Sequence, residues 1–409
     1  MMNFNKYQEF LNCGKHEILA FDYIIEKALD KGYELYCNCK DYKPGDKLIF
    51  AFKKKLIALV ELGDDLEEGS NMIISHIDSP RLDVIPNDPF VKEDDGVFWK
   101  TVPYGGIVAQ LWLDRPLVLV GRAMNNKGET VNINTEDIGV SFTITSLLPH
   151  LGGRKETDEL KCEKLLVRMG DNILEGLKDK YGLTEDNLKF ADLSFVPYGN
   201  AYELGFNKEF IASYGHDDRV CAYAELEALF NSNASNKTKI ALFTSYEETG
   251  SGQSTGAESQ YIDDIFIELL DSEKIARRAI RNSKMISADV CAGYDSNYAS
   301  HFEKNCKPIC GQGVGIVPFL GNKRGNDATI VMREHVRKLC EDNNIAYQLE
   351  TTKLGEGGGG TVSTFFCIKG VEVIDCGVPV LAMHSPQELI HKNDLQAAYD
   401  LYKVFFESD

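Results

Sequence analysis

Four short apolar segments of this 409-residue chain each end in a side chain that can bind a metal ion. The segment MIIS precedes His76, ALFTSY precedes Glu247 and Glu248, MISA precedes Asp289, and VLAM precedes His384. Compact apolar runs of this kind are typical of buried strands. In an open α/β sheet, ligands gather beyond the carboxyl ends of the strands. The recurrence therefore predicts an α/β fold in which these side chains converge on one crevice.

The candidate ligands form a mixed set of nitrogen and oxygen donors. Asp217, in HDDRV at the start of a predicted helix, joins His76, Glu248, Asp289 and His384 to give two imidazoles and three carboxylates. Such a set suits zinc, with cobalt or manganese as alternatives. Five protein ligands exceed the needs of one open catalytic site, but they suit two metal ions that share a bridging carboxylate. The set predicts two ions of zinc, or of a similar divalent metal, per subunit and hydrolysis by a metal-activated water.

Two further residues are predicted to assist these ligands. Asp78 lies two residues beyond His76, on the same side of an extended chain, where its carboxylate would accept the imidazole N–H. Glu247, next to Glu248, would serve as the general base. Taken alone, a histidine is usually structural and a Glu pair is usually solvated. Their coincidence at apolar strand ends favours a site, because unpaired carboxylates are costly to bury.

The spacing of the candidate ligands predicts the domain organisation. His76 and Asp217 are 141 residues apart, whereas one strand–helix unit needs about 30 residues. The intervening stretch includes VNINTEDIGVSFTITSLLPHL, which alternates apolar and polar residues as strands do. We therefore expect a catalytic domain made of residues 1–91 and 212–409, with a mostly β domain inserted at 92–211. The last predicted element, 394–406, has one apolar helical face and is expected to pack on the core.

Charge and cysteine content limit the partners and the compartment. Lys and Arg number 44 and Asp and Glu number 63, so the formal charge is 44 − 63 = −19, which repels nucleic acids and anionic membranes. No apolar run approaches the roughly 18 residues of a transmembrane helix. The 11 cysteines are odd in number and scattered, as expected for free thiols in a reducing compartment. These features predict a cytoplasmic protein with no nucleic-acid or membrane partner.

Five motifs, in their order along the chain, resemble those of the aspartyl aminopeptidase and aminopeptidase I family, metallopeptidase family eighteen. They are SHIDSPRLDV, HDDRV, YEETGSGQSTGA, SADV and DCGVPVLAMHSPQE, and the likeness extends to YGGIVAQLWLDRPLVLVGR. The resemblance covers nearly the whole chain. It implies a dinuclear zinc aminopeptidase acting on peptides, with a zinc-exopeptidase-like catalytic domain interrupted by a dimerisation domain. It further implies a homo-oligomer in which dimers assemble into a tetrahedral dodecamer.

The same resemblance implies a role for each matching residue. One metal would be bound by His76 and Asp289, the other by Glu248 and His384, and Asp217 would bridge them. By motif, Glu247 would act as the acid or base, and Asp78 would orient an imidazole. His150 would enter a neighbouring subunit's active site, and the Asp217–Asp218 peptide bond would be cis.

One position departs from the aspartyl-selective members of the family. Where those members have a lysine, this chain has Val317, within GVGIVPF. Loss of the cation predicts a neutral or apolar N-terminal residue in the substrate, unless Lys323 or Arg324 takes the lysine's place. Three alternatives stay open: an aspartyl-selective aminopeptidase, a dinuclear-metal deacylase and a non-catalytic assembly scaffold. The presence of Glu247 and all five ligands argues against the scaffold.

Overall fold

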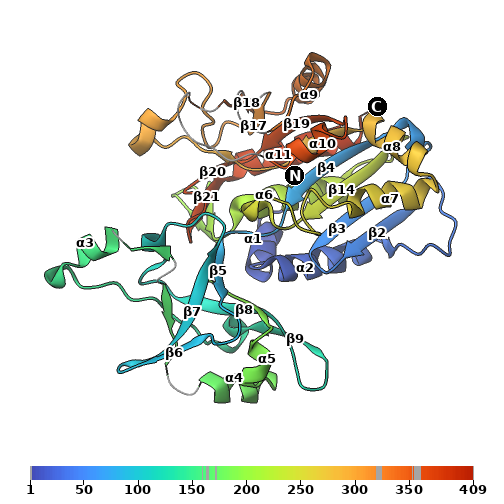
Figure 1. Ribbon diagram of the computed structural model, residues 1–409. Helices are drawn as coiled ribbons and strands as arrows, with labels where there is room; N and C mark the ends of the chain where they lie inside the picture. Colours follow the sequence, from blue (N-terminus) through green and yellow to red (C-terminus); the bar gives the residue numbers. More distant parts are fainter. Residues whose placement is uncertain are drawn as a thin grey trace. The chain divides into compact units, whose positions relative to one another are not determined.

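The structure is a computed structural model that describes residues 2–158, 160–162, 165–170, 173–318, 325–351, 353 and 361–408. The chain forms two compact units. The first consists of Met1–Asp78, Ala201–Met383 and Glu388–Asp409, and the second of Ser79–Asn200 and His384–Gln387. Helices and sheets occur together (Figure 1), which confirms the predicted α/β class.

A nine-stranded sheet forms the centre of the first unit. Its strands, in spatial order, are β1 (Glu34–Leu35), β2 (Lys47–Phe52), β3 (Leu56–Glu61), β14 (Thr238–Thr244), β4 (Ser70–His76), β15 (Lys284–Ser287), β19 (Glu372–Gly377), β17 (Val314–Val317) and β18 (Tyr347–Leu349). The four strands β14, β4, β15 and β19 run parallel to one another. Their carboxyl ends therefore lie at the same edge of the sheet.

Helices cover both faces of this sheet (Figure 1). One face packs on α1 (Phe4–Cys13), α2 (Glu17–Asp30), α6 (His216–Asn231), α9 (Ile330–Asp342) and α11 (Lys392–Phe406). The other face packs on α7 (Tyr261–Leu270), α8 (Glu273–Asn282) and α10 (Ser363–Cys367).

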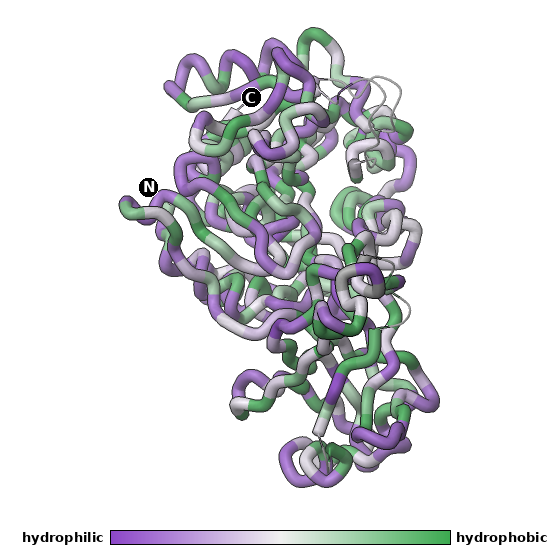
Figure 2. Tube along the Cα trace, turned by 90° about the vertical axis from the view of Figure 1, so that its left-hand side faces the viewer, coloured by the Kyte–Doolittle hydropathy of each residue, from purple (hydrophilic) through white to green (hydrophobic). Residues whose placement is uncertain are grey.

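Side chains of β4 point alternately into the hydrophobic cores on the two faces of the sheet. Ile73 belongs to one hydrophobic cluster, and its neighbours Met72 and Ile74 belong to the other, because successive side chains of a strand point to opposite faces. Hydrophilic and hydrophobic segments alternate along the chain in Figure 2. The terminal helix α11 buries Leu395 and Tyr402 as its apolar face predicted.

A smaller five-stranded sheet in the first unit leads into α6. Its order is β12 (Tyr202–Leu204), β13 (Phe210–Ser213), β21 (Glu388–His391), β20 (Pro379–Leu381) and β16 (Cys291–Ala292). Gly215, between β13 and α6, has a left-handed φ of 75°, a conformation that glycine adopts without steric cost. This turn starts α6 directly after the strand.

The second unit is built on a seven-stranded antiparallel sheet. It contains β10 (Leu166–Arg168), β7 (Gly96–Tyr104), β5 (Arg81–Val84), β11 (Asp192–Pro197), β8 (Leu117–Met124) and β9 (Thr130–Asn134), with β6 (Phe90–Glu93) paired to β7. The helices α3 (Gly153–Asp158), α4 (Ile173–Tyr181) and α5 (Glu185–Leu188) accompany it. The sequence placed the insertion at 92–211. The compact unit starts at Ser79 because β5 pairs with β7 and β11, and β13 belongs to the first unit because it pairs with β21.

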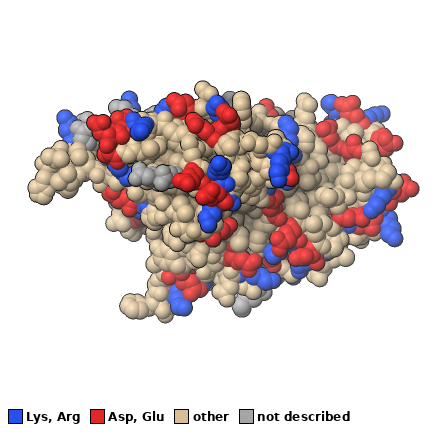
Figure 3. Space-filling view, turned by 90° about the horizontal axis from the view of Figure 1, so that it is seen from below, with Lys and Arg blue, Asp and Glu red and all other residues tan. Residues whose placement is uncertain are grey.

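The cysteines and the surface add two further observations. The prediction of free thiols is wrong for Cys37 and Cys39, which form a disulfide, whereas the other nine cysteines form no disulfide among the described residues. The two cysteines are only two residues apart in the sequence. The odd total number of cysteines did not indicate this disulfide. Within the described part of the chain, no helix combines the length and the apolar character needed to span a membrane. On the face drawn in Figure 3, groups of acidic side chains are mixed with Lys and Arg.

Candidate metal centre

Three adjacent parallel strands deliver candidate ligands to one edge of the nine-stranded sheet. His76 is the last residue of β4 and lies opposite Thr244, the last residue of β14. The chain leaving β14 forms the 3-10 helix η6 (Glu247–Thr249), which carries both glutamates. Asp289 follows the end of β15, two residues beyond Ser287. The parallel pairing of β4 with both neighbours thus brings these side chains together.

Distances from His76 define the cluster. Its Nε2 atom lies 3.3 Å from Asp217 Oδ1, 3.9 Å from Glu247 Oε2 and 3.9 Å from Asp289 Oδ1. Two sets of three residues offer ligand atoms that all lie within 4.8 Å of one another. These sets are His76 with Asp217 and Glu248, and His76 with Asp218 and Asp289. The structure therefore groups four of the five predicted ligands.

Asp218 is the member of this cluster that the sequence did not single out as a ligand. It is fully buried, and its Oδ2 atom accepts the backbone N–H of His76 at 3.2 Å. The Asp217–Asp218 peptide bond is cis, which confirms the expectation from the family resemblance. The backbone N–H of Asp217 donates to Glu388 Oε2 at 3.0 Å. The only sequence signal for Asp218 was its place beside Asp217 in HDDRV.

Asp78 connects the imidazole of His76 with the glutamate pair. His76 Nδ1 lies 3.1 Å from the backbone oxygen of Asp78 and 3.4 Å from its Oδ1 atom. The Asp78 carboxylate also accepts the backbone N–H groups of Glu247 and Glu248, each at 3.3 Å. The sequence pointed to contact with the imidazole only. The bonds to the glutamate backbone mean that Asp78 also fixes the turn after β14.

Burial makes this concentration of carboxyl groups unfavourable without a cation. It raises the pKa of Glu248 and of Asp289 well above the usual range, and neighbouring carboxylates raise both further. Burial opposes protonation of His76, yet the nearby Asp217 and Asp78 raise its pKa well above 6.5. Within the described residues, His76 Nε2 has no hydrogen-bond partner. A buried imidazole nitrogen facing several carboxylates fits a bound divalent cation, which offsets the cost of burying the charges.

His384 belongs to the second compact unit. It follows β20, has a left-handed φ of 64°, and is half-buried. Its Nδ1 atom lies 2.8 Å from the backbone oxygen of Gly106. A hydrogen bond to that oxygen would place the proton on Nδ1 and leave Nε2 as the nitrogen able to bind a metal.

The other predicted residues lie outside the cluster. His150 is exposed in the 3-10 helix η4 (Pro149–Leu151) of the second unit. Val317 ends β17, is almost buried and pairs with Asp375 of β19. Lys323 and Arg324 fall outside the described residues.

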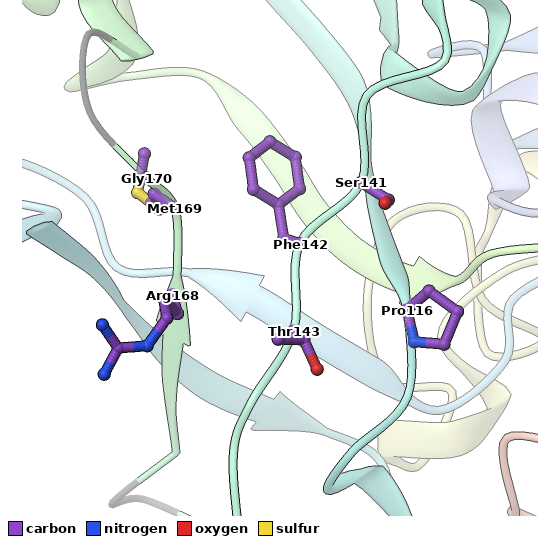
Figure 4. A pocket seen from close by; sticks show the side chains of 7 residues that line it. All are labelled: Pro116, Ser141, Phe142, Thr143, Arg168, Met169 and Gly170. Atoms are coloured by element: carbon purple, nitrogen blue, oxygen red, sulfur yellow. The ribbon is translucent and has the colours of Figure 1, made fainter.

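A pocket of about 380 Å³ opens in the second unit (Figure 4). Its lining consists of Pro116, Ser141, Phe142, Thr143, Arg168, Met169 and Gly170, and so includes none of the predicted site residues. The Arg168 guanidinium donates to the Asp95 carboxylate at 2.6 Å and stacks on Phe98. Its charge is therefore already compensated, and we assign this pocket no role.

Comparison with known proteins decides the family. The model of the aminopeptidase I zinc metalloproteases (M18) matches residues 10–406. The chain belongs to this family. Among curated M18 relatives, a probable M18 family aminopeptidase 1 of Borreliella afzelii is 36% identical over 100% of this chain and 96% of the relative. The membership confirms the resemblance found in the sequence and supports aminopeptidase activity.

Solved structures of M18 proteins have the same fold. The M18 aminopeptidase of Thermotoga maritima superposes with a TM-score of 0.92 at 32% identity, covering 99% of this chain and 95% of that one. The S. cerevesiae mApe1 dodecamer matches with a TM-score of 0.81 at 18% identity, covering 98% and 95%. The second match, at lower sequence identity, is a likeness in fold alone.

Proposed function

We propose that this chain is a zinc-dependent aminopeptidase that uses two metal ions to remove single N-terminal residues from peptides. The observation that carries the proposal is the cluster of His76, Asp217, Glu248 and Asp289 at the carboxyl edge of the parallel strands. Family membership supplies the reaction class. The donor types supply the preference for zinc.

Each metal would have its own residues. His76 and Asp289 would hold one ion, Glu248 and His384 the other, and Asp217 would bridge them, as the family motifs imply. The short separation of His76 Nε2 from Asp217 Oδ1, 3.3 Å, is compatible with a shared ion. Bound zinc would lower the pKa of a water molecule and polarise the scissile carbonyl.

Glu247 would carry the proton transfer. Its Oε2 atom would take a proton from the attacking water and return it to the leaving amine, as a general base and then a general acid. The Glu247 side chain is about one-fifth exposed, at 19%, so substrate can reach it. Asp78, through the backbone N–H of Glu247, would hold this carboxylate in place.

The proposed substrate carries a neutral or apolar N-terminal residue. Val317 presents an apolar side chain where aspartyl-selective members have a lysine. Its cross-strand partner Asp375 adds a carboxyl group and not a cation. An acidic substrate side chain beside these two residues would gain no opposite charge.

A comparison of two peptides tests the reaction and the substrate together. The zinc-loaded protein is expected to cleave a Leu-led peptide faster than an Asp-led one, and a chelator should abolish both activities. Faster cleavage of the Asp-led peptide would overturn the substrate preference and leave the reaction intact. Cleavage of acyl amino acids without cleavage of either peptide would replace the aminopeptidase by a deacylase.

We further propose that the second unit assembles copies of this chain into dimers and a larger particle. It exposes the large apolar side chains of Leu147, Leu148 and Leu151, which flank His150 in the sequence, and those of Val108 and Leu111 elsewhere in the unit. Exposed apolar residues that lie together are typical of protein interfaces. The dodecamer of the distant mApe1 relative gives a precedent, and His150 would reach a neighbouring copy's active site.

A further inference from the structure

A carboxyl group that the mechanism above does not use lies in the core beneath the metal centre. Glu225, in α6, has no exposed surface. Its Oε1 atom accepts the backbone N–H of Leu242 at 2.8 Å, and its Oε2 atom accepts the Ser75 hydroxyl at 2.5 Å. An apolar side chain of similar size would fill this space without the cost of burying a carboxyl group. Packing alone therefore does not explain why this position holds a glutamate.

The two hydrogen bonds of Glu225 join three elements that carry candidate ligands or lead directly to them. Ser75 in β4 directly precedes His76, and Leu242 belongs to β14, which leads to the glutamate pair. Glu225 itself lies in α6, whose first turn carries Asp217 and Asp218. The Glu225 carboxyl group thus links β4, which ends in His76, with α6, which carries Asp217, and with β14, which leads to the two glutamates.

Other bonds restrain the same point of β4. Asp218 Oδ2 accepts the backbone N–H of His76 at 3.2 Å, and the Thr244 hydroxyl donates to the backbone oxygen of Ser75 at 3.2 Å. Both bonds involve the backbone of β4, and they restrain the position of the His76 backbone. Among the residues that make these bonds, Glu225 alone bonds both to the Ser75 side chain and to the backbone of β14. Its loss would free α6 to shift against both strands.

We propose that Glu225 is a positioning residue that holds α6 against β4 and β14 and so sets the separation of His76 and Asp217. The proposal rests on the function proposed above. Groups that orient metal ligands typically contribute 10- to 100-fold to metal affinity. Glu225→Met keeps the volume and removes both acceptors, so it should lower zinc affinity by about 10- to 100-fold. Glu225→Gln can still accept from Leu242 and donate to Ser75, so it should restore most of that affinity.

The experiment measures zinc affinity by competition with a chromogenic chelator, together with the visible absorption spectrum of the cobalt-substituted protein. Glu225→Met should bind zinc more weakly and shift the cobalt bands, while Glu225→Gln keeps both near wild type. Glu227→Met is the matched control, because Glu227 lies in the same helix but is half-buried, and its side-chain hydrogen bond in the described part of the chain is a local one, from Asn231. Its affinity and spectrum should stay unchanged.

Ser75→Ala provides a second, smaller test, because it removes only the donor to Oε2. It should lower zinc affinity several-fold, and it answers the question if Glu225→Met fails to fold. Wild-type zinc affinity and cobalt spectrum in both variants would overturn the role of Glu225 while leaving the metal centre intact. Failure of the wild-type protein to bind zinc would instead overturn the proposed function, and the role of Glu225 with it.

Discussion

Glu247 and Glu248 are neighbours in the chain, but we propose different work for them. Glu248 belongs to a group that could hold a metal ion, whereas Glu247 is placed to move a proton. Glu247→Gln should therefore lower kcat by about 10²- to 10⁴-fold, the usual contribution of general acid–base catalysis. Zinc content, measured by atomic absorption, should stay at the wild-type value. Equal loss of zinc and activity would make Glu247 a ligand and not a base.

Val317 gives a second test at the residue scale. Val317→Lys adds a cation beside the position proposed to face the substrate's first side chain. The ratio of kcat/KM for an Asp-led peptide to that for a Leu-led peptide should rise at least tenfold, since a hydrogen bond to a charged group contributes about 1.5–3 kcal/mol and a tenfold change corresponds to about 1.4 kcal/mol. Val317→Met is the neutral control and should leave the ratio unchanged. A ratio that moves equally in both variants would remove Val317 from substrate selection.

At the scale of single elements, the start of α11 holds a carboxyl group whose ionisation is unfavourable. Burial raises the pKa of Asp394 from 3.8 to about 6, although the backbone N–H groups of Gly311 and Gly313 bond to it. A raised acid pKa stabilises the fold at low pH, and this contribution is lost as pH rises through about 6. The shift corresponds to about 3 kcal/mol. The wild-type protein should therefore gain stability relative to Asp394→Asn as pH falls from 7.5 to 4.5.

Urea unfolding at the two pH values measures this change as a difference between wild type and variant. Comparing the two proteins at each pH cancels the contributions of all other titrating groups. Parallel pH profiles for the free energy of unfolding would contradict the raised pKa of Asp394.

The strand ends could be predicted from the sequence because each is a short apolar run followed by a polar residue that could bind a metal ion. Local pattern was enough for His76, Glu248 and Asp289, since parallel neighbours bring their ends to one edge. The local sequence pattern was not enough to predict that Asp218 and Glu225 lie at or near the candidate site. Their positions depend on how α6 meets β4 and β14, and a helix start with two adjacent aspartates reads locally as a cap. The unit boundary at Ser79 was also missed, because the pairing of β5 depends on strands far away in the chain.

At the scale of the whole molecule, the apolar surface of the second unit is proposed to hold the particle together. Replacing Leu148 and Leu151, which are 50% and 67% exposed, by serine should reduce the mass in solution. Light scattering after size exclusion measures that mass. Leu35→Ser is the control, since Leu35 is 58% exposed but lies in the first unit. An unchanged mass in the double variant would exclude this surface as an assembly interface.

The insertion also determines when a newly made chain can complete its sheet. Ser75 and Thr244 bond across β4 and β14, yet 169 positions separate them in the sequence. At about 5–20 residues per second, a ribosome needs roughly 10–30 s to synthesise the second strand after the first. During that interval His76 waits at the end of an unpaired hydrophobic strand, while the inserted unit has time to fold. Zinc capture by the proposed centre would therefore be a late event for each nascent chain, after the early steps of folding.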